Sequence, residues 1–201
     1  MDNTINYYNT NARDFISNTK DVVFNETQDL FINEILSRFS NDNLLILDFG
    51  CGSGRDTKYF LDKGFQVEAI DGSKEMCRFA SEYTGLNVRQ VLFQDWKSDK
   101  FYNGIWACSS ILHLSHDMLI TVLKNLLQHL EPNGILYTSF KYGNFEGERD
   151  GRYFINFTEE TFNKFLNNLD DFKLIKSWIT SDVRPGRENE KWLNIFLQNS
   201  Y

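Results

Sequence analysis

The stretch LLILDFGCGSGR, residues 44–55, decides the fold class of this 201-residue chain. Residues 44–49 form a short, continuous apolar run, which is typical of a central parallel strand buried on both faces. The loop that follows is built on three glycines, Gly50, Gly52 and Gly54. Glycines there let the backbone turn tightly and approach a ligand closely. Because open α/β sheets bind ligands beyond the carboxyl ends of their strands, this loop predicts a site for a nucleoside-like molecule.

Downstream of the loop, helix and strand patterns alternate. Helical spacing occurs at 56–63, 74–83 and 117–130, and strand-like runs occur at 65–70, 88–93, 104–108 and 135–140. The turn EPNG, residues 131–134, separates the last of these helices from its strand. The alternation predicts βαβ units around a parallel sheet.

The two ends of the chain carry different patterns. Residues 9–18 and 26–39 have helical spacing and precede the first strand, so they are expected to cover the sheet. Residues 141–157 predict a loop, and Thr158 is expected to open a helix. Two further strands, 172–180 and 192–197, are joined by a polar, turn-rich segment and predict a hairpin.

Composition excludes several classes of protein. The chain carries 21 basic and 28 acidic side chains, a net charge of −7, which disfavours bulk nucleic acid as a partner. Its three cysteines form no CxxC pair, so we expect reduced thiols and no metal site. We find no signal peptide pattern and no apolar run of the roughly 20 residues that span a bilayer, and we expect a cytoplasmic protein without membrane contact. The oligomeric state stays open.

The spacing of the glycines bears on the cofactor. A dinucleotide-binding loop has the pattern GxGxxG, but Arg55 occupies the position of its third glycine. Asp71 follows the loop by about 20 residues, where an acidic side chain can accept the two ribose hydroxyls. Asp71 would serve NAD equally well. Arg55, which replaces the third glycine, is the residue that disfavours a dehydrogenase.

Three motifs in order carry a family resemblance. DFGCGSGR at 48–55, AIDGS at 69–73 and FQDW at 93–96 resemble the S-adenosylmethionine (SAM) binding motifs of class I methyltransferases, and LEPNGILYTSF at 130–140 resembles the fifth-strand motif of that family. GCGSGRDT, IWACSSILHL, SFKYG and DGRYF are similar to a bacterial group of small methyltransferases near the tellurite-resistance type. The resemblance implies SAM as cofactor and S-adenosylhomocysteine (SAH) as product.

The resemblance also completes the expected fold. It implies an α/β, doubly wound, Rossmann-like, seven-stranded mixed sheet with an antiparallel C-terminal hairpin and an N-terminal helical lid. We expect a single domain over residues 1–201, with the lid segment in 1–42 and the core in 43–201.

By the same resemblance, a set of residues would bind the cofactor: Asp48, Gly50, Cys51, Gly52, Arg55, Asp71, Gly72, Ser73, Met76, Gln94, Asp95, Trp96, Ser109 and Ser110. Several have structural alternatives. Asp71 and Ser73 also suit a helix N-terminus, and Asp95 an Asx turn. Trp96 could cover the sheet edge, and Arg55 could close an ion pair instead of binding the methionine carboxylate of SAM. Cys51 is expected to contribute only its backbone.

Two residues are candidates for catalysis. His113 follows the fourth strand and titrates near neutral pH, so it is a candidate base for the acceptor's proton. Tyr8 lies in the expected lid and is a candidate for reaching the site. The alternatives are a partly buried, hydrogen-bonded histidine and a tyrosine that serves only as hydrophobic cover.

A basic and aromatic set is concentrated in two loops expected at strand ends: Lys141, Tyr142, Arg149, Arg152, Tyr153, Arg184 and Arg187. If these side chains converge, their guanidinium groups suit a carboxylate or phosphate on a substrate. Acidic neighbours could instead pair with them in place.

The leading hypothesis is an enzyme that transfers the SAM methyl group to a small molecule, with an anionic acceptor as the finer hypothesis. Two alternatives remain open from the sequence: a methyltransferase that acts on tRNA or protein, and a SAM-binding protein without catalysis.

Overall fold

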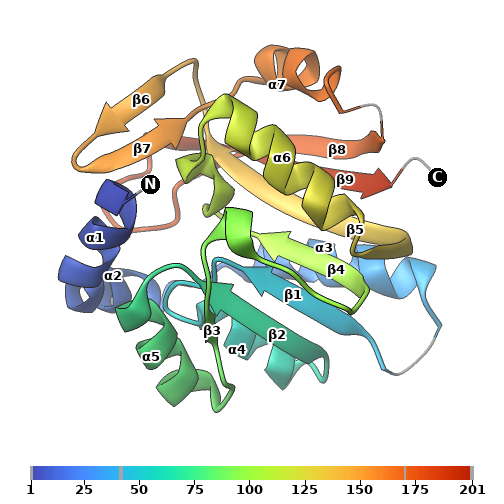
Figure 1. Ribbon diagram of the computed structural model, residues 1–201, viewed down its shortest axis with the longest axis horizontal. Helices are drawn as coiled ribbons and strands as arrows, with labels where there is room; N and C mark the ends of the chain where they lie inside the picture. Colours follow the sequence, from blue (N-terminus) through green and yellow to red (C-terminus); the bar gives the residue numbers. More distant parts are fainter. Residues whose placement is uncertain (1, 41–42, 170, 200–201) are drawn as a thin grey trace.

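A seven-stranded sheet forms the centre of the computed structural model, which describes residues 2–40, 43–169 and 171–199 (Figure 1). Its strand order is β3-β2-β1-β4-β5-β9-β8. The strands are β1 (Leu45–Phe49), β2 (Gln66–Asp71), β3 (Arg89–Gln90), β4 (Tyr102–Ala107), β5 (Leu130–Lys141), β8 (Phe172–Ser181) and β9 (Lys191–Asn199). The first five run parallel, and β9 is antiparallel to both β5 and β8. This is the expected seven-stranded mixed sheet.

Helices cover both faces of the sheet. The helices are α1 (Asp2–Thr10), α2 (Ala12–Thr19), α3 (Asn25–Arg38), α4 (Arg55–Asp62), α5 (Lys74–Thr84), α6 (His116–Leu127) and α7 (Glu159–Leu166). Residues of β1 alternate between two cores: Leu47 packs with residues of α6 and α7, and Ile46 with residues of α3 and α4. This two-sided burial explains why the strand reads as a continuous apolar run. No helix of the described residues is long and apolar enough to cross a membrane.

Local signals explain where the helices begin. Gly54 precedes α4 with a φ of 78°, a left-handed conformation that favours glycine. The Ser73 side chain accepts the backbone N–H of Met76 and caps α5. Thr158 caps α7 as expected and exchanges hydrogen bonds with Thr161.

Four predictions of local structure need correction. The segment 131–134, expected as a turn before the strand, is part of β5. The helix expected at 9–18 is two helices, α1 and α2, which meet at Asn11, and α1 begins at Asp2. The strand expected at 88–93 is only the two residues of β3, followed by a short 3-10 helix, η1 (Phe93–Asp95). The loop expected at 141–157 contains a hairpin of β6 (Glu146–Arg149) and β7 (Arg152–Ile155). Its turn is Asp150-Gly151, with φ of 51° and 73°, a sequence that favours two-residue hairpins.

The helices of the expected lid segment lie in two different places. α1 and α2 lie with the β6–β7 hairpin at the end of the sheet toward which β1 and β4 point (Figure 1). α3 instead packs on the sheet itself, with Phe31 and Ile35 fully buried. Residues 1 and 200–201 at the ends of the expected domain, and residues 41–42 at the end of the expected lid segment, lie outside the described residues.

Candidate functional site

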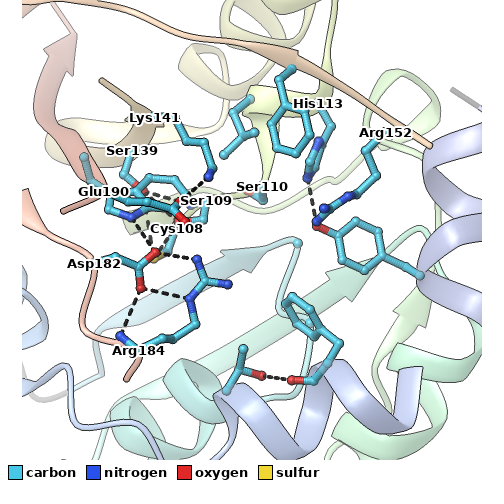
Figure 2. A pocket seen from close by; sticks show the side chains of 18 of the residues that line it. Cys108, Ser109, Ser110, His113, Ser139, Lys141, Arg152, Asp182, Arg184 and Glu190 are labelled. Carbon is cyan, nitrogen blue, oxygen red and sulfur yellow. Dashed lines mark hydrogen bonds and ion pairs between the residues drawn. The ribbon is translucent and has the colours of Figure 1, made fainter. Parts of the chain in front are cut away.

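A cavity of about 720 Å³ opens at the carboxyl ends of the parallel strands. The glycine loop and the ends of β2, β4 and β5 line its floor, and α1, α2, the β6–β7 hairpin and the β8–β9 connection line the rest. Its size lies within the range of small-molecule sites. Figure 2 shows side chains from these elements directed toward one another.

The glycine loop is shaped by its neighbours. Gly50 has a φ of +91°, and a Cβ there would lie 2.5 Å from the Ser110 Cβ and 2.9 Å from the Phe93 ring. Its N–H, like that of Cys51, donates to the carbonyl of Ile70. Any side chain at Gly50 would therefore meet both a forbidden dihedral and a steric overlap, which explains the glycine.

Asp71 lies where an acidic partner for ribose is expected. Its two carboxylate oxygens accept the N–H groups of Gly52 at 2.9 Å and of Ser73 at 2.8 Å, and its side chain lines the cavity. Burial raises the pKa of Asp71, and the backbone N–H groups around it oppose that rise. Each oxygen has a second lone pair, so the carboxylate can still accept hydroxyl groups from a ligand.

A second cavity continues from this point. It is lined by Gly72, Leu92 and Asp95, together with Ile5 of α1. Met76 lines the main cavity. Gly72 lines both cavities, with Met76 in the lining of the first and Asp95 in that of the second.

Four expected cofactor residues lie outside both cavities: Asp48, Ser73, Gln94 and Trp96. Asp48 is buried below the loop and accepts the Thr57 hydroxyl at 2.5 Å, and burial with nearby Asp56 raises its pKa. The Ser73 hydroxyl caps α5 and donates to Asn9. Trp96 packs edge-on against Phe49 in the core. Asp48, Ser73 and Trp96 therefore belong to the scaffold around the site and not to its lining.

Cys51 and Arg55 both line the cavity. Burial raises the pKa of the Cys51 thiol well above its usual range, which opposes a thiolate nucleophile. Arg55 donates two hydrogen bonds to Asp56, at 2.7 and 3.0 Å. Burial opposes its charge, but Asp56 overcomes this and raises the pKa of Arg55. The ion-pair alternative for Arg55 is therefore present in the structure.

The residues after β4 turn sharply into the cavity. Ser109 has a φ of 52°, uncommon for a residue with a side chain, and its N–H donates to the Ser139 hydroxyl at 2.9 Å. Ser110 donates its hydroxyl to the carbonyl of Phe49 at 2.6 Å. Both serines line the cavity, and they join the strand ends of β4, β5 and β1.

His113 and Tyr8 both line the cavity and are joined by a hydrogen bond. The His113 Nδ1 lies 2.6 Å from the carbonyl oxygen of Tyr153, and its Nε2 lies 2.9 Å from the Tyr8 hydroxyl. Because a carbonyl only accepts, Nδ1 carries the proton, and Nε2 accepts from Tyr8. Burial lowers the pKa of His113 to about 4, so the imidazole is neutral at neutral pH. Burial also raises the pKa of Tyr8, which keeps its hydroxyl protonated.

The basic and aromatic set is only partly brought together. Six of its seven residues line the cavity, and Tyr153 lies outside it, with its hydroxyl donated to Glu146. Tyr142 donates to Glu159 at 2.8 Å. Three cations of the set form ion pairs: Lys141 and Arg187 with Glu190, and Arg184 with Asp182.

Arg149 and Arg152 behave differently from the rest of this set. Among the described residues neither forms an ion pair, and both guanidinium carbons lie 5.1 Å from the centre of the Phe154 ring. Arg152 also stacks on Tyr7 at 4.1 Å.

Sequence reasoning missed several residues that line the cavity: Thr4, Ile5, Phe15, Thr19, Ser139 and Asp182. Four of them lie in α1 and α2. The four-residue spacing of Thr4 and Tyr8 was the available signal for α1. No group of three or more metal-ligating side chains is found in the part of the chain that the structure describes.

Comparison with known proteins agrees with this geometry. Residues 46–134 match the model of a methyltransferase domain family. The ubiquinone biosynthesis O-methyltransferase of Rickettsia typhi is 32% identical over 116 residues, 54% of this chain and 46% of that protein. An uncharacterized methyltransferase of Staphylococcus carnosus is 27% identical over 84% of this chain and 86% of its own length. The chain thus spans less than half the length of the Rickettsia relative.

Two solved structures show the same fold. A S-adenosylmethionine-dependent methyltransferase from Clostridium acetobutylicum superposes with a TM-score of 0.69 at 15% identity, covering 98% of this chain and 97% of that one. The 1,6-didemethyltoxoflavin-N1-methyltransferase of Burkholderia thailandensis gives 0.74 at 21% identity, covering 97% and 85%. The resemblance to the tellurite-resistance type stays a prediction. Its three ordered motifs, its sheet and these matches support the class I SAM-dependent methyltransferase fold and family that the sequence predicts.

Proposed function

We propose that this protein transfers the methyl group of SAM to a small-molecule acceptor. One observation carries the proposal: a single cavity joins the glycine loop and Asp71 to the polar residues after β4 and β5, beneath α1. Its volume of about 720 Å³ suits a cofactor and a small acceptor better than a macromolecule. One structural neighbour supports a small-molecule acceptor, since the Burkholderia enzyme is named for a small molecule.

The residues present fit the cofactor. Gly50 and Gly52 leave the loop backbone bare, Asp71 offers carboxylate oxygens for ribose hydroxyls, and Gly72 with Asp95 would flank the adenine. When bound, SAM would supply a methyl group on its sulfonium, which the acceptor attacks in line as the carbon–sulfur bond breaks and SAH leaves. The protein's contribution is to align that acceptor and to exclude water under α1.

Tyr8 and His113 are the candidates for handling a proton. If the acceptor is a hydroxyl, its proton would pass to the Tyr8 oxygen as the Tyr8 proton passes to His113 Nε2 along the 2.9 Å hydrogen bond. The resulting imidazolium would keep its Nδ1–H donated to the Tyr153 carbonyl. A base of low pKa suffices for this step, because a hydroxyl oxygen becomes strongly acidic as it is methylated.

Calorimetric titration with SAH tests the cofactor assignment. We expect saturable binding to the wild type, at least tenfold weaker binding to Asp71→Ala, and no binding of NADH. Formation of SAH from SAM is then measured with panels of small hydroxy and amino acids, and with bulk tRNA and protein. Binding of NADH alone would refute the cofactor assignment, and methylation of tRNA alone would refute the small-molecule acceptor.

A further inference from the structure

The charge around the cavity differs from that of the whole chain. The chain carries a net charge of −7, yet basic side chains outnumber acidic ones among the residues that line the cavity. A basic lining in an acidic protein favours an anionic ligand. The number of cations alone does not locate the binding group, because most of them are already paired.

The paired cations are held by carboxylates of the same cavity. Arg184 donates to Asp182 through two nitrogens, and Trp192 donates to the same carboxylate. Burial opposes the charge of Asp182, but these hydrogen bonds overcome it and lower the pKa of Asp182 to about 2. Lys141 and Arg187 share Glu190. In Figure 2 the Arg184–Asp182 pair lies on one side of the cavity, and Arg152 and His113 lie on the other.

Arg152 is half-buried and keeps unused hydrogen-bonding capacity. Its guanidinium carbon lies 4.1 Å from the centre of the Tyr7 ring and 5.1 Å from that of Phe154. The Nε atom is buried and has no hydrogen-bond partner among the described residues. A buried donor without an acceptor is costly, and because Arg152 lines the cavity, an acceptor on a ligand held there could relieve that cost. Stacking on ring faces leaves the edge of a guanidinium free to donate two parallel hydrogen bonds.

We propose that Arg152, with the more exposed Arg149 that also lies over the Phe154 ring, forms a subsite for a carboxylate or phosphate group of the methyl acceptor. The subsite lies beside the Tyr8–His113 pair, since Arg152 is 5.9 Å from the Tyr8 ring. It therefore selects acceptors that carry an anionic group close to the methylated atom. That the anion belongs to a methyl acceptor rests on the proposed function, but binding of an anion at this subsite can be tested separately.

The competing interpretation is that Arg152 only holds the lid. β7 and α1 are also joined by the hydrogen bond from the Tyr153 N–H to the Thr4 hydroxyl, so stacking on Tyr7 could be purely structural. That role requires no anion. The two interpretations are separated by a titration with simple anions.

The experiment follows backbone amide shifts by NMR while SAH-saturated protein is titrated with inorganic phosphate and, in a second arm, with succinate at constant ionic strength. We expect saturable shifts in residues 149–154, and Arg152→Gln should weaken binding of the preferred anion about tenfold or more. Lys164→Gln removes the same charge from an exposed ion pair on α7 and is the matched control. The arm that binds more tightly identifies a phosphate or a carboxylate.

Each outcome decides the matter. Absence of saturable shifts in the wild type, or equal weakening by Arg152→Gln and Lys164→Gln, would overturn the proposal. SAH binding is measured on the same samples: if SAH fails to bind, the cofactor assignment fails, and the anion titration is read on the free protein. If Arg152→Gln does not fold, Arg152→Lys retains the charge and loses the bidentate donor, and unchanged binding of both anions would refute the proposal.

Discussion

The buried imidazole of His113 makes the stability of this protein depend on pH in a specific way. Burial lowers its pKa in the folded chain to about 4, from 6.5 when it is exposed. Between these values the unfolded chain binds more protons, so the free energy of unfolding falls as the pH is lowered through this window. Integrated from pH 8 to pH 5, the loss for this group is roughly 2 kcal/mol.

Urea unfolding of wild type and His113→Asn at pH 8 and pH 5 measures this quantity. Asparagine keeps a donor for the Tyr153 carbonyl but does not titrate. We expect the variant to lose less stability than the wild type between the two pH values, by roughly 2 kcal/mol. His116→Asn, which removes an exposed imidazole, is the matched control. The same pH dependence in His113→Asn and wild type would refute a neutral, buried His113.

Three further changes test the site and its scaffold. Gly50→Ala, whose Cβ would overlap Ser110, should weaken SAH binding in calorimetry more than about tenfold, whereas Gly64→Ala, with a φ of +89° and nothing within 4 Å, should leave it unchanged; equal losses would contradict the steric argument. Thr158→Ala should lower the free energy of unfolding by about 1 kcal/mol in urea, and no change would rule out the cap. Tyr8→Phe should shift the His113 Nε2 resonance in ¹⁵N NMR while SAH affinity stays within about threefold; an unshifted resonance would disprove the hydrogen bond.

Most of the fold followed from local sequence patterns. The apolar run of β1, the glycines after it and the alternation downstream each reflect a requirement of the backbone at that position. Errors occurred where the local signal was weak. β3 is an exposed edge strand of two residues, and α1 is short and polar except for the face it buries.

Within the site, the sequence by itself determined the glycine loop and Asp71, because their spacing along one βαβ unit places them together. Tertiary structure alone decided which polar side chains meet. Tyr8 and His113 are 105 positions apart, and Lys141 and Glu190 are 49 apart, so neither hydrogen bond has a local signature. The packing of the β6–β7 hairpin and α1 over the strand ends decides which cations form ion pairs with carboxylates. It also decides that Arg152 forms none among the described residues. The sequence determines the charge of a side chain, but the packing of distant segments determines which group it pairs with.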